Sequence, residues 1–155
     1  MTKGQAGYYS LLAGLAAAGA AAAELLGGWD SLLQILVTVM GADFLLGTAL
    51  ALVWKRSPKT ADGRFESRAG AKGLFRKCGV LLCVLVAARL DVLFGGEGYV
   101  RTLVILFFLA NEGFSVLENL GAMGLPLPPA LKNAFAALAE KSGALGGEQP
   151  PAQKK

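Results

Sequence analysis

The feature that most constrains this chain is a polar stripe within an otherwise apolar stretch, residues 107–121. Nine positions of this stretch hold five carboxylate, amide and hydroxyl side chains: Asn111, Glu112, Ser115, Glu118 and Asn119. At 100° per residue, the five fall within an arc of roughly 120° on one helix face. Because a carboxylate that faces lipid costs several kcal/mol, such a helix fits a membrane only if its stripe contacts protein or water. The alternative is an amphipathic helix of a soluble protein.

The composition favours the membrane. Of the 155 residues, 54% are hydrophobic and only 17% are charged, whereas soluble domains carry about 25% charged residues. Eight of the fifteen Lys and Arg lie between positions 55 and 77, and the stretches on either side are nearly uncharged. One soluble core does not accommodate four such hydrophobic runs. The sequence therefore predicts an all-α integral membrane protein with about four transmembrane helices.

The four predicted spans lie near 8–27, 29–54, 78–94 and 99–123. The second span is bounded by Trp29 and Trp54, as expected of rings at membrane interfaces, and it contains Asp43 and, one turn later, Gly47. A carboxylate in the middle of a span favours a functional or assembly role over a purely structural one.

The first span is rich in alanine, and two other interpretations remain open for it: a cleaved secretory signal, or a helix that lies on the membrane surface. The third span, with 17 residues, is at the short limit and contains Arg89 and Asp91. Four small residues are expected to allow close helix packing: Gly14, Ala18, Gly47 and Gly113.

A basic loop, residues 55–77, separates the second and third spans. It holds eight cations, Lys55, Arg56, Lys59, Arg64, Arg68, Lys72, Arg76 and Lys77. Against Asp62 and Glu66 their local net charge is +6 (eight minus two). Between two spans, this pattern predicts a cytoplasmic loop that contacts anionic lipid headgroups, in preference to a nucleic-acid patch. Ser67 is expected to cap a helix that begins there.

This placement predicts that the N-terminus and C-terminus are both cytoplasmic, since the two short turns near 27–30 and 95–98 contain no Lys or Arg. After a Pro-rich stop, residues 130–141 have the spacing of an amphipathic helix at the membrane surface. Residues 1–141 would form a single helical membrane domain, and 142–155 a disordered tail. The chain is expected to cross a membrane several times.

The predicted topology places three ionisable groups at one depth. Asp43, Arg89 and Glu112 each lie 11 residues from the expected cytoplasmic end of their span, which is about 16 Å along a helix. We therefore expect an interhelical cluster in which Asp43 or Glu112 neutralises Arg89. The cluster would either fix the assembly or line water in an assembled lesion.

Nothing in the sequence indicates catalysis. There is no histidine, and Cys78 and Cys83, five residues apart, fit neither a zinc site nor a structural disulfide. We expect no enzymatic activity, no cofactor, no metal and no nucleic-acid partner.

The chain resembles the phage holins, a family that includes toxin-secretion holins. The resemblance covers roughly residues 40–140. It rests on Asp43 with Gly47, on Ser67, Gly70, Gly73, Leu74 and Lys77, on Asp91, on Asn111, Glu112, Gly113, Ser115, Glu118 and Asn119, and on Gly124, Pro126 and Pro128.

The resemblance implies a small protein of phage or prophage origin that oligomerises in the host membrane and opens lesions. A cell-wall hydrolase or a toxin leaves through them, without a stable complex. The polar stripe and the charged residues Asp43, Arg89 and Asp91 would then serve self-association or line the lesion. Two rival interpretations are a small transporter or channel subunit that uses Asp43, Arg89 and Glu112 as a relay, and a membrane scaffold protein.

Overall fold

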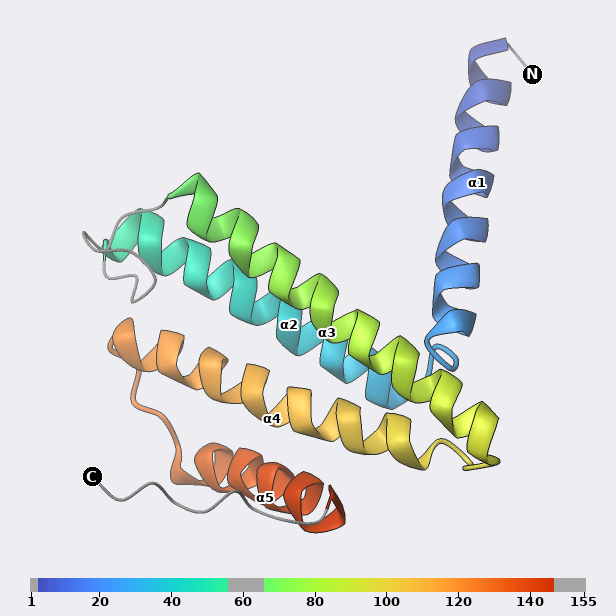
Figure 1. Ribbon diagram of the computed structural model, residues 1–155. Helices are drawn as coiled ribbons and strands as arrows, with labels where there is room; N and C mark the ends of the chain where they lie inside the picture. Colours follow the sequence, from blue (N-terminus) through green and yellow to red (C-terminus); the bar gives the residue numbers. More distant parts are fainter. Residues whose placement is uncertain (1–2, 56–65, 147–155) are drawn as a thin grey trace.

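The computed structural model describes residues 3–55 and 66–146, and all of its regular secondary structure there is helical (Figure 1). The elements are α1 (Lys3–Leu25), α2 (Ser31–Ala49), the π-helical turn η1 (Leu50–Trp54), α3 (Ser67–Phe94), α4 (Tyr99–Ala122) and α5 (Pro129–Gly146). The prediction of an all-α protein is confirmed.

Helices α2, α3 and α4 run side by side as a bundle, and α5 lies along α4 (Figure 1). Helix α4 is central, because it packs against α2, α3 and α5. Helix α1 projects away from the bundle, and none of its side chains from residue 4 to 25 is buried. The fold is thus a three-helix bundle with one attached helix on its side and one free helix at its end.

The bundle core is a layer of aliphatic side chains from three helices: Leu33, Leu36, Met40, Val80, Val84, Ile105 and Leu109. Their spacing of three and four residues is what a helix needs to present one face to its neighbours. On α2 the same face continues to Asp43 and Leu50. The helical register therefore carries a carboxylate into the interior.

Three helices of the described residues are long and apolar enough to cross a membrane: Gly4–Leu25, Ser31–Trp54 and Tyr99–Ala122. The predicted span 78–94 is not among them. It forms part of α3, whose apolar portion is 17 residues long, so any 18-residue stretch of α3 contains three or more charged residues. The described residues thus contain three candidate spans, where about four were expected.

Two boundaries also differ from the prediction. Helix α3 begins at Ser67, but its N-cap is Glu66 and no side chain caps it, so half of the expected loop 55–77 is helical. Helix α5 begins at Pro129, which suits the first turn of a helix, and it continues to Gly146. Residues 142–146 are therefore helical, and the rest of the predicted tail lies outside the described residues.

Candidate functional site

One buried face on each bundle helix positions a charged residue in the interior. On α3 the buried face is formed by Val80, Val84, Ala88 and Asp91, and Lys77 precedes Val80 by three residues on that face. On α4 the face through Ile105 and Leu109 continues to Glu112.

Lys77 joins the two carboxylates Asp43 and Glu112. Its ammonium nitrogen lies 2.8 Å from Asp43 Oδ2 and also donates to Glu112 Oε2. The side chains of Lys77, Asp43 and Glu112 are only 12%, 6% and 10% exposed. We call these three residues the ion triad; it links α3 to both α2 and α4.

Asn119 completes the hydrogen bonding of the ion triad. Its side-chain amide donates to Asp43 Oδ1 at 3.0 Å. Asp43 thus accepts hydrogen bonds from both Lys77 and Asn119. Within the described residues, the Glu112 side chain accepts a hydrogen bond only from Lys77. Two carboxylates share one ammonium, and removing that ammonium would leave both carboxylates without a cation.

The expected pairing of Arg89 with Asp43 or Glu112 is wrong. Arg89 follows Ala88 and lies off the buried face of α3, and its guanidinium donates to the backbone carbonyls of Glu24 and Leu25, at 3.2 and 2.8 Å. The prediction took residue 78 as the cytoplasmic end of the third span and measured depth from there, whereas α3 begins 11 residues earlier, at Ser67 as expected. Lys77 is therefore ten residues, about 15 Å, inside α3 and meets Asp43 and Glu112 at their level.

A second polar cluster lies at the bundle end where the α1–α2 and α3–α4 turns meet. Arg101, only 6% exposed, donates to the carbonyls of Leu26 and Gly28, at 2.5 and 3.1 Å, and pairs with Asp30 at 2.6 Å. These bonds lower the pKa of the Asp30 carboxyl below its usual value of 3.8, chiefly through the hydrogen bond from Arg101. Asp30 also caps α2 by accepting from the Leu33 N–H.

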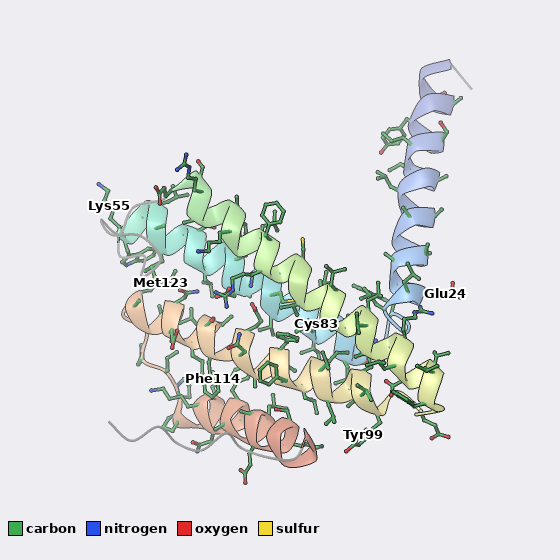
Figure 2. The ribbon with its side chains drawn as sticks, viewed as in Figure 1. Glu24, Lys55, Cys83, Tyr99, Phe114 and Met123 are labelled. Atoms are coloured by element: carbon green, nitrogen blue, oxygen red, sulfur yellow. The ribbon has the colours of Figure 1, made fainter. Side chains whose placement is uncertain are left out.

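Asp91 belongs to the same end of the bundle and acts as a cap. Its two carboxylate oxygens accept from the backbone N–H groups of Val100 and Arg101, at 2.9 and 2.8 Å. These N–H groups lie in the first turn of α4, where no partner exists within the helix. The cap residue of α4 is Gly98, which has no side chain to offer. We call Asp30, Arg89, Asp91 and Arg101 the turn cluster; Figure 2 labels Glu24, whose carbonyl Arg89 binds, at the base of α1.

The polar stripe of α4 divides into two sides. Glu112 and Asn119 are buried toward α2 and α3, whereas Asn111 and Glu118 are exposed and Ser115 is half-buried. Neither Asn111 nor Glu118 has a hydrogen-bond or ion-pair partner within the part of the chain that the structure describes. The outward side therefore places an amide and a carboxylate on the surface of a candidate span.

The basic residues also separate into two groups. Lys55, Arg68, Lys72 and Arg76 are exposed, as a contact with lipid headgroups requires. Lys77, which was expected to act with them, instead points into the bundle and pairs with Asp43 and Glu112 in the ion triad. Arg56, Lys59 and Arg64 lie outside the described residues.

The four small residues expected at helix contacts have different surroundings. Gly14 has open space around it, and Ala18 is exposed, so α1 uses neither within the described chain. Gly47 is half-buried. Gly113 lies directly under the ring of Phe135 of α5, and Phe114, labelled in Figure 2, lies near the same ring with centroids 6.3 Å apart. Gly113 thus permits the close approach of α4 and α5.

Sequence reasoning missed Arg101 and Asp30 as site residues, and it assigned Lys77 to lipid headgroups instead of to the ion triad. A signal existed for Lys77, because the spacing Lys77, Val80, Val84, Ala88 and Asp91 follows one helix face and excludes Arg89. Asp30 stands directly before a helix, where carboxylates cap. Arg101 is a single cation in an apolar run, and nothing in the sequence indicates its partners.

Comparison with known proteins defines the class. The model of the Bacteriophage holin family matches residues 20–140, more than three quarters of the chain. An uncharacterized protein of Listeria innocua is 35% identical over 130 residues, covering 84% of this chain and 87% of that protein. An uncharacterized 14.9 kDa protein from the nagH 3' region of Clostridium perfringens is 35% identical over 118 residues, covering 76% and 83%.

A protein of Bacillus phage phi105 described as a probable holin is 36% identical over 63 residues, covering 41% of this chain and 47% of that protein. No solved structure matches the chain. The chain belongs to the bacteriophage holin family. It is a non-enzymatic, multi-pass membrane protein, and the resemblance noted in the sequence is confirmed.

Proposed function

We propose that this protein is a holin that accumulates in the bacterial cytoplasmic membrane, assembles with copies of itself and opens lesions through which a cell-wall hydrolase leaves. The observation that carries the proposal is the outward side of α4. The chain matches the model of a family of membrane-permeabilising proteins. On the candidate span α4, Asn111 and Glu118 have no hydrogen-bond or ion-pair partner within the described chain.

Unpartnered polar groups on a span favour self-association. Facing lipid, the Glu118 carboxylate is costly, and contact with another subunit or with water relieves that cost. The Asn111 amide can hydrogen-bond across helices in the same way. Copies that associate through this face would enclose polar groups, which is what an aqueous lesion requires.

The arrangement of the bundle argues against a relay through one subunit. The ion triad and the turn cluster are separated by the apolar layer that includes Leu36, Val84 and Ile105, each 0% exposed. Along α4 the gap from Arg101 to Glu112 is 11 residues, about 16 Å. A transporter relay would need polar groups within that gap.

Topology and lipid contacts form part of the proposal. The exposed residues Lys55, Arg68, Lys72 and Arg76 lie at one end of the bundle helices, and the bias of cations toward the cytoplasm favours this end as the inner one. In the proposed topology α3 crosses the membrane between α2 and α4, and α1 crosses too, so that both termini lie inside. These residues would bind anionic headgroups. The hydrolase, or a toxin in its place, would pass through the lesion without a stable complex, and no cofactor or nucleic acid takes part.

The test is co-expression with a muralytic enzyme that lacks its own export signal. We expect abrupt, timed lysis that requires both proteins. Glu118→Gln should change the time of lysis, whereas Glu97→Gln, at an exposed position in the α3–α4 turn, serves as the matched control. Steady growth with the protein present in the membrane would contradict the holin function and favour a transporter or scaffold. Unchanged timing in Glu118→Gln would reject the outward face of α4 as the assembly surface.

A further inference from the structure

We propose that Lys77 is a positioning residue that holds the subunit closed, and that separation of the ion triad is the step that makes the subunit competent to open a lesion. The proposal rests on the holin function and names its regulation. Lys77 connects α3 to α2 through Asp43 and to α4 through Glu112. No one of the three helices can leave the others without breaking an ion pair.

The position of the ion triad in the core distinguishes it from a surface ion pair. The apolar layer borders it on one side, and on the other side Leu50 and Ala51 of η1 are 0% and 6% exposed. Buried aliphatic side chains therefore flank the ion triad on both sides along the helices. Apolar residues of similar volume would pack there with equal or greater stability. The three charged side chains are therefore not the residues that would make this part of the core most stable.

Charged side chains at this position suit a protein whose helices are packed together in one state and separated in another. In the closed subunit, Lys77 compensates Asp43 and Glu112, and the amide of Asn119 supports Asp43. When α2, α3 and α4 separate, the same groups become polar surface that water can solvate. The ion triad thus stabilises the closed arrangement by pairing and the open one by hydration, so its strength sets the balance between them.

The composition of the ion triad makes this balance sensitive to Lys77 in particular. Loss of either carboxylate leaves one carboxylate and one ammonium, which still pair. Loss of the ammonium leaves two carboxylates close together without a cation, and like charges at short distance repel. Lys77 is therefore the member whose removal acts against the closed state only.

The experiment compares three changes in the full-length protein. Lys77→Met leaves the two carboxylates unpaired. The triple change Lys77→Met, Asp43→Asn and Glu112→Gln removes all three charges, and Lys77→Arg keeps the cation. Lys132→Met, at an exposed lysine of α5, is the control. Lysis time is measured at matched amounts of protein in the membrane.

A second readout does not depend on lysis. Val84 is 0% exposed between the helices, so Val84→Cys, in a background with Cys78→Ser and Cys83→Ser, places a thiol that a soluble maleimide reaches only when the helices separate. If the unmodified protein does not cause lysis, the proposed holin function is refuted, but the role of Lys77 in holding the helices together is not. The thiol would still report whether Lys77 keeps the helices together.

We expect Lys77→Met to shift lysis to an earlier time and to speed modification of the thiol. The triple variant should lyse later than the unmodified protein and react more slowly, while Lys77→Arg and Lys132→Met should stay close to the unmodified protein in both measurements. Unchanged thiol reactivity in Lys77→Met would overturn the proposal, as would delayed lysis at normal accumulation. If Lys77→Met does not accumulate, the triple variant decides: later lysis supports the proposal, and unchanged timing overturns it.

Discussion

The two polar clusters of this bundle use the same kinds of side chain for different purposes. In the turn cluster, Arg89, Asp91 and Arg101 bond mainly to backbone groups of the turns. In the ion triad, Lys77 bonds to side chains on two other helices. Charges bound to backbone fix where helices begin and end, whereas charges bound to one another decide whether helices stay together. Substitutions in the turn cluster should therefore reduce the stability and the accumulation of the protein, whereas substitutions in the ion triad should change the time of lysis.

The largest expected effect comes from Arg101→Leu. The change removes the hydrogen bonds to the carbonyls of Leu26 and Gly28 and leaves Asp30 without its cation. Because each hydrogen bond to a charged group contributes about 1.5–3 kcal/mol, we expect a loss of at least roughly 3 kcal/mol, measured as unfolding in detergent micelles. Arg76→Leu, at an exposed arginine, is the control. Equal stability of the two variants would contradict a structural role for the turn cluster.

Gly27→Ala should have the next largest effect. Gly27 has φ +87°, and a Cβ there would lie 2.8 Å from Arg101 Cδ. Gly28 has φ +105° and open space around it, so Gly28→Ala carries the backbone strain of roughly 1–2 kcal/mol without the overlap. The difference in unfolding free energy between the two variants measures how tightly Arg101 holds the turn. A larger loss in Gly28→Ala would show that the contact is not tight.

Asp91→Ala removes the two hydrogen bonds that cap α4. Loss of a capping side chain costs about 1 kcal/mol, so we expect a modest fall in the midpoint of thermal unfolding, followed by circular dichroism. Glu97→Ala, at an exposed carboxylate of the same turn, should leave the midpoint unchanged. A fall in lysis time with no change in the midpoint would instead place Asp91 in the lesion.

The smallest effect is a pH dependence at Asp30. The folded-state pKa lies below the usual 3.8, so Asp30 stabilises the fold above pH 3.8 and loses that contribution as pH falls through the folded value. The side chain is 46% exposed, and solvent screening keeps the effect small. Between pH 5 and strongly acid conditions, the unmodified protein should lose slightly more thermal stability than Asp30→Asn. If thermal stability depends on pH in the same way in both proteins, Asp30 does not contribute to the pH dependence.

Sequence alone located α2 and α4 because long apolar runs have few alternatives. It also placed Asp43 and Glu112 at one level, since both runs end in recognisable breaks. For α3 it predicted the start at Ser67 but took residue 78 as the cytoplasmic end of the span, and that choice exchanged Lys77 for Arg89. The functions of Asp91 and Arg101 depend on turn geometry between segments far apart in sequence, which helical spacing does not encode.

The central claim is that the assembled protein permeabilises a membrane to macromolecules. The direct measurement is release from vesicles that contain the purified protein, loaded with a small dye and with a dextran of the size of a muralytic enzyme. We predict that both leave the vesicles, and that Lys77→Met releases them sooner than Lys132→Met does. Retention of the dextran while the dye leaves would indicate a narrow channel, and retention of both would contradict permeabilisation.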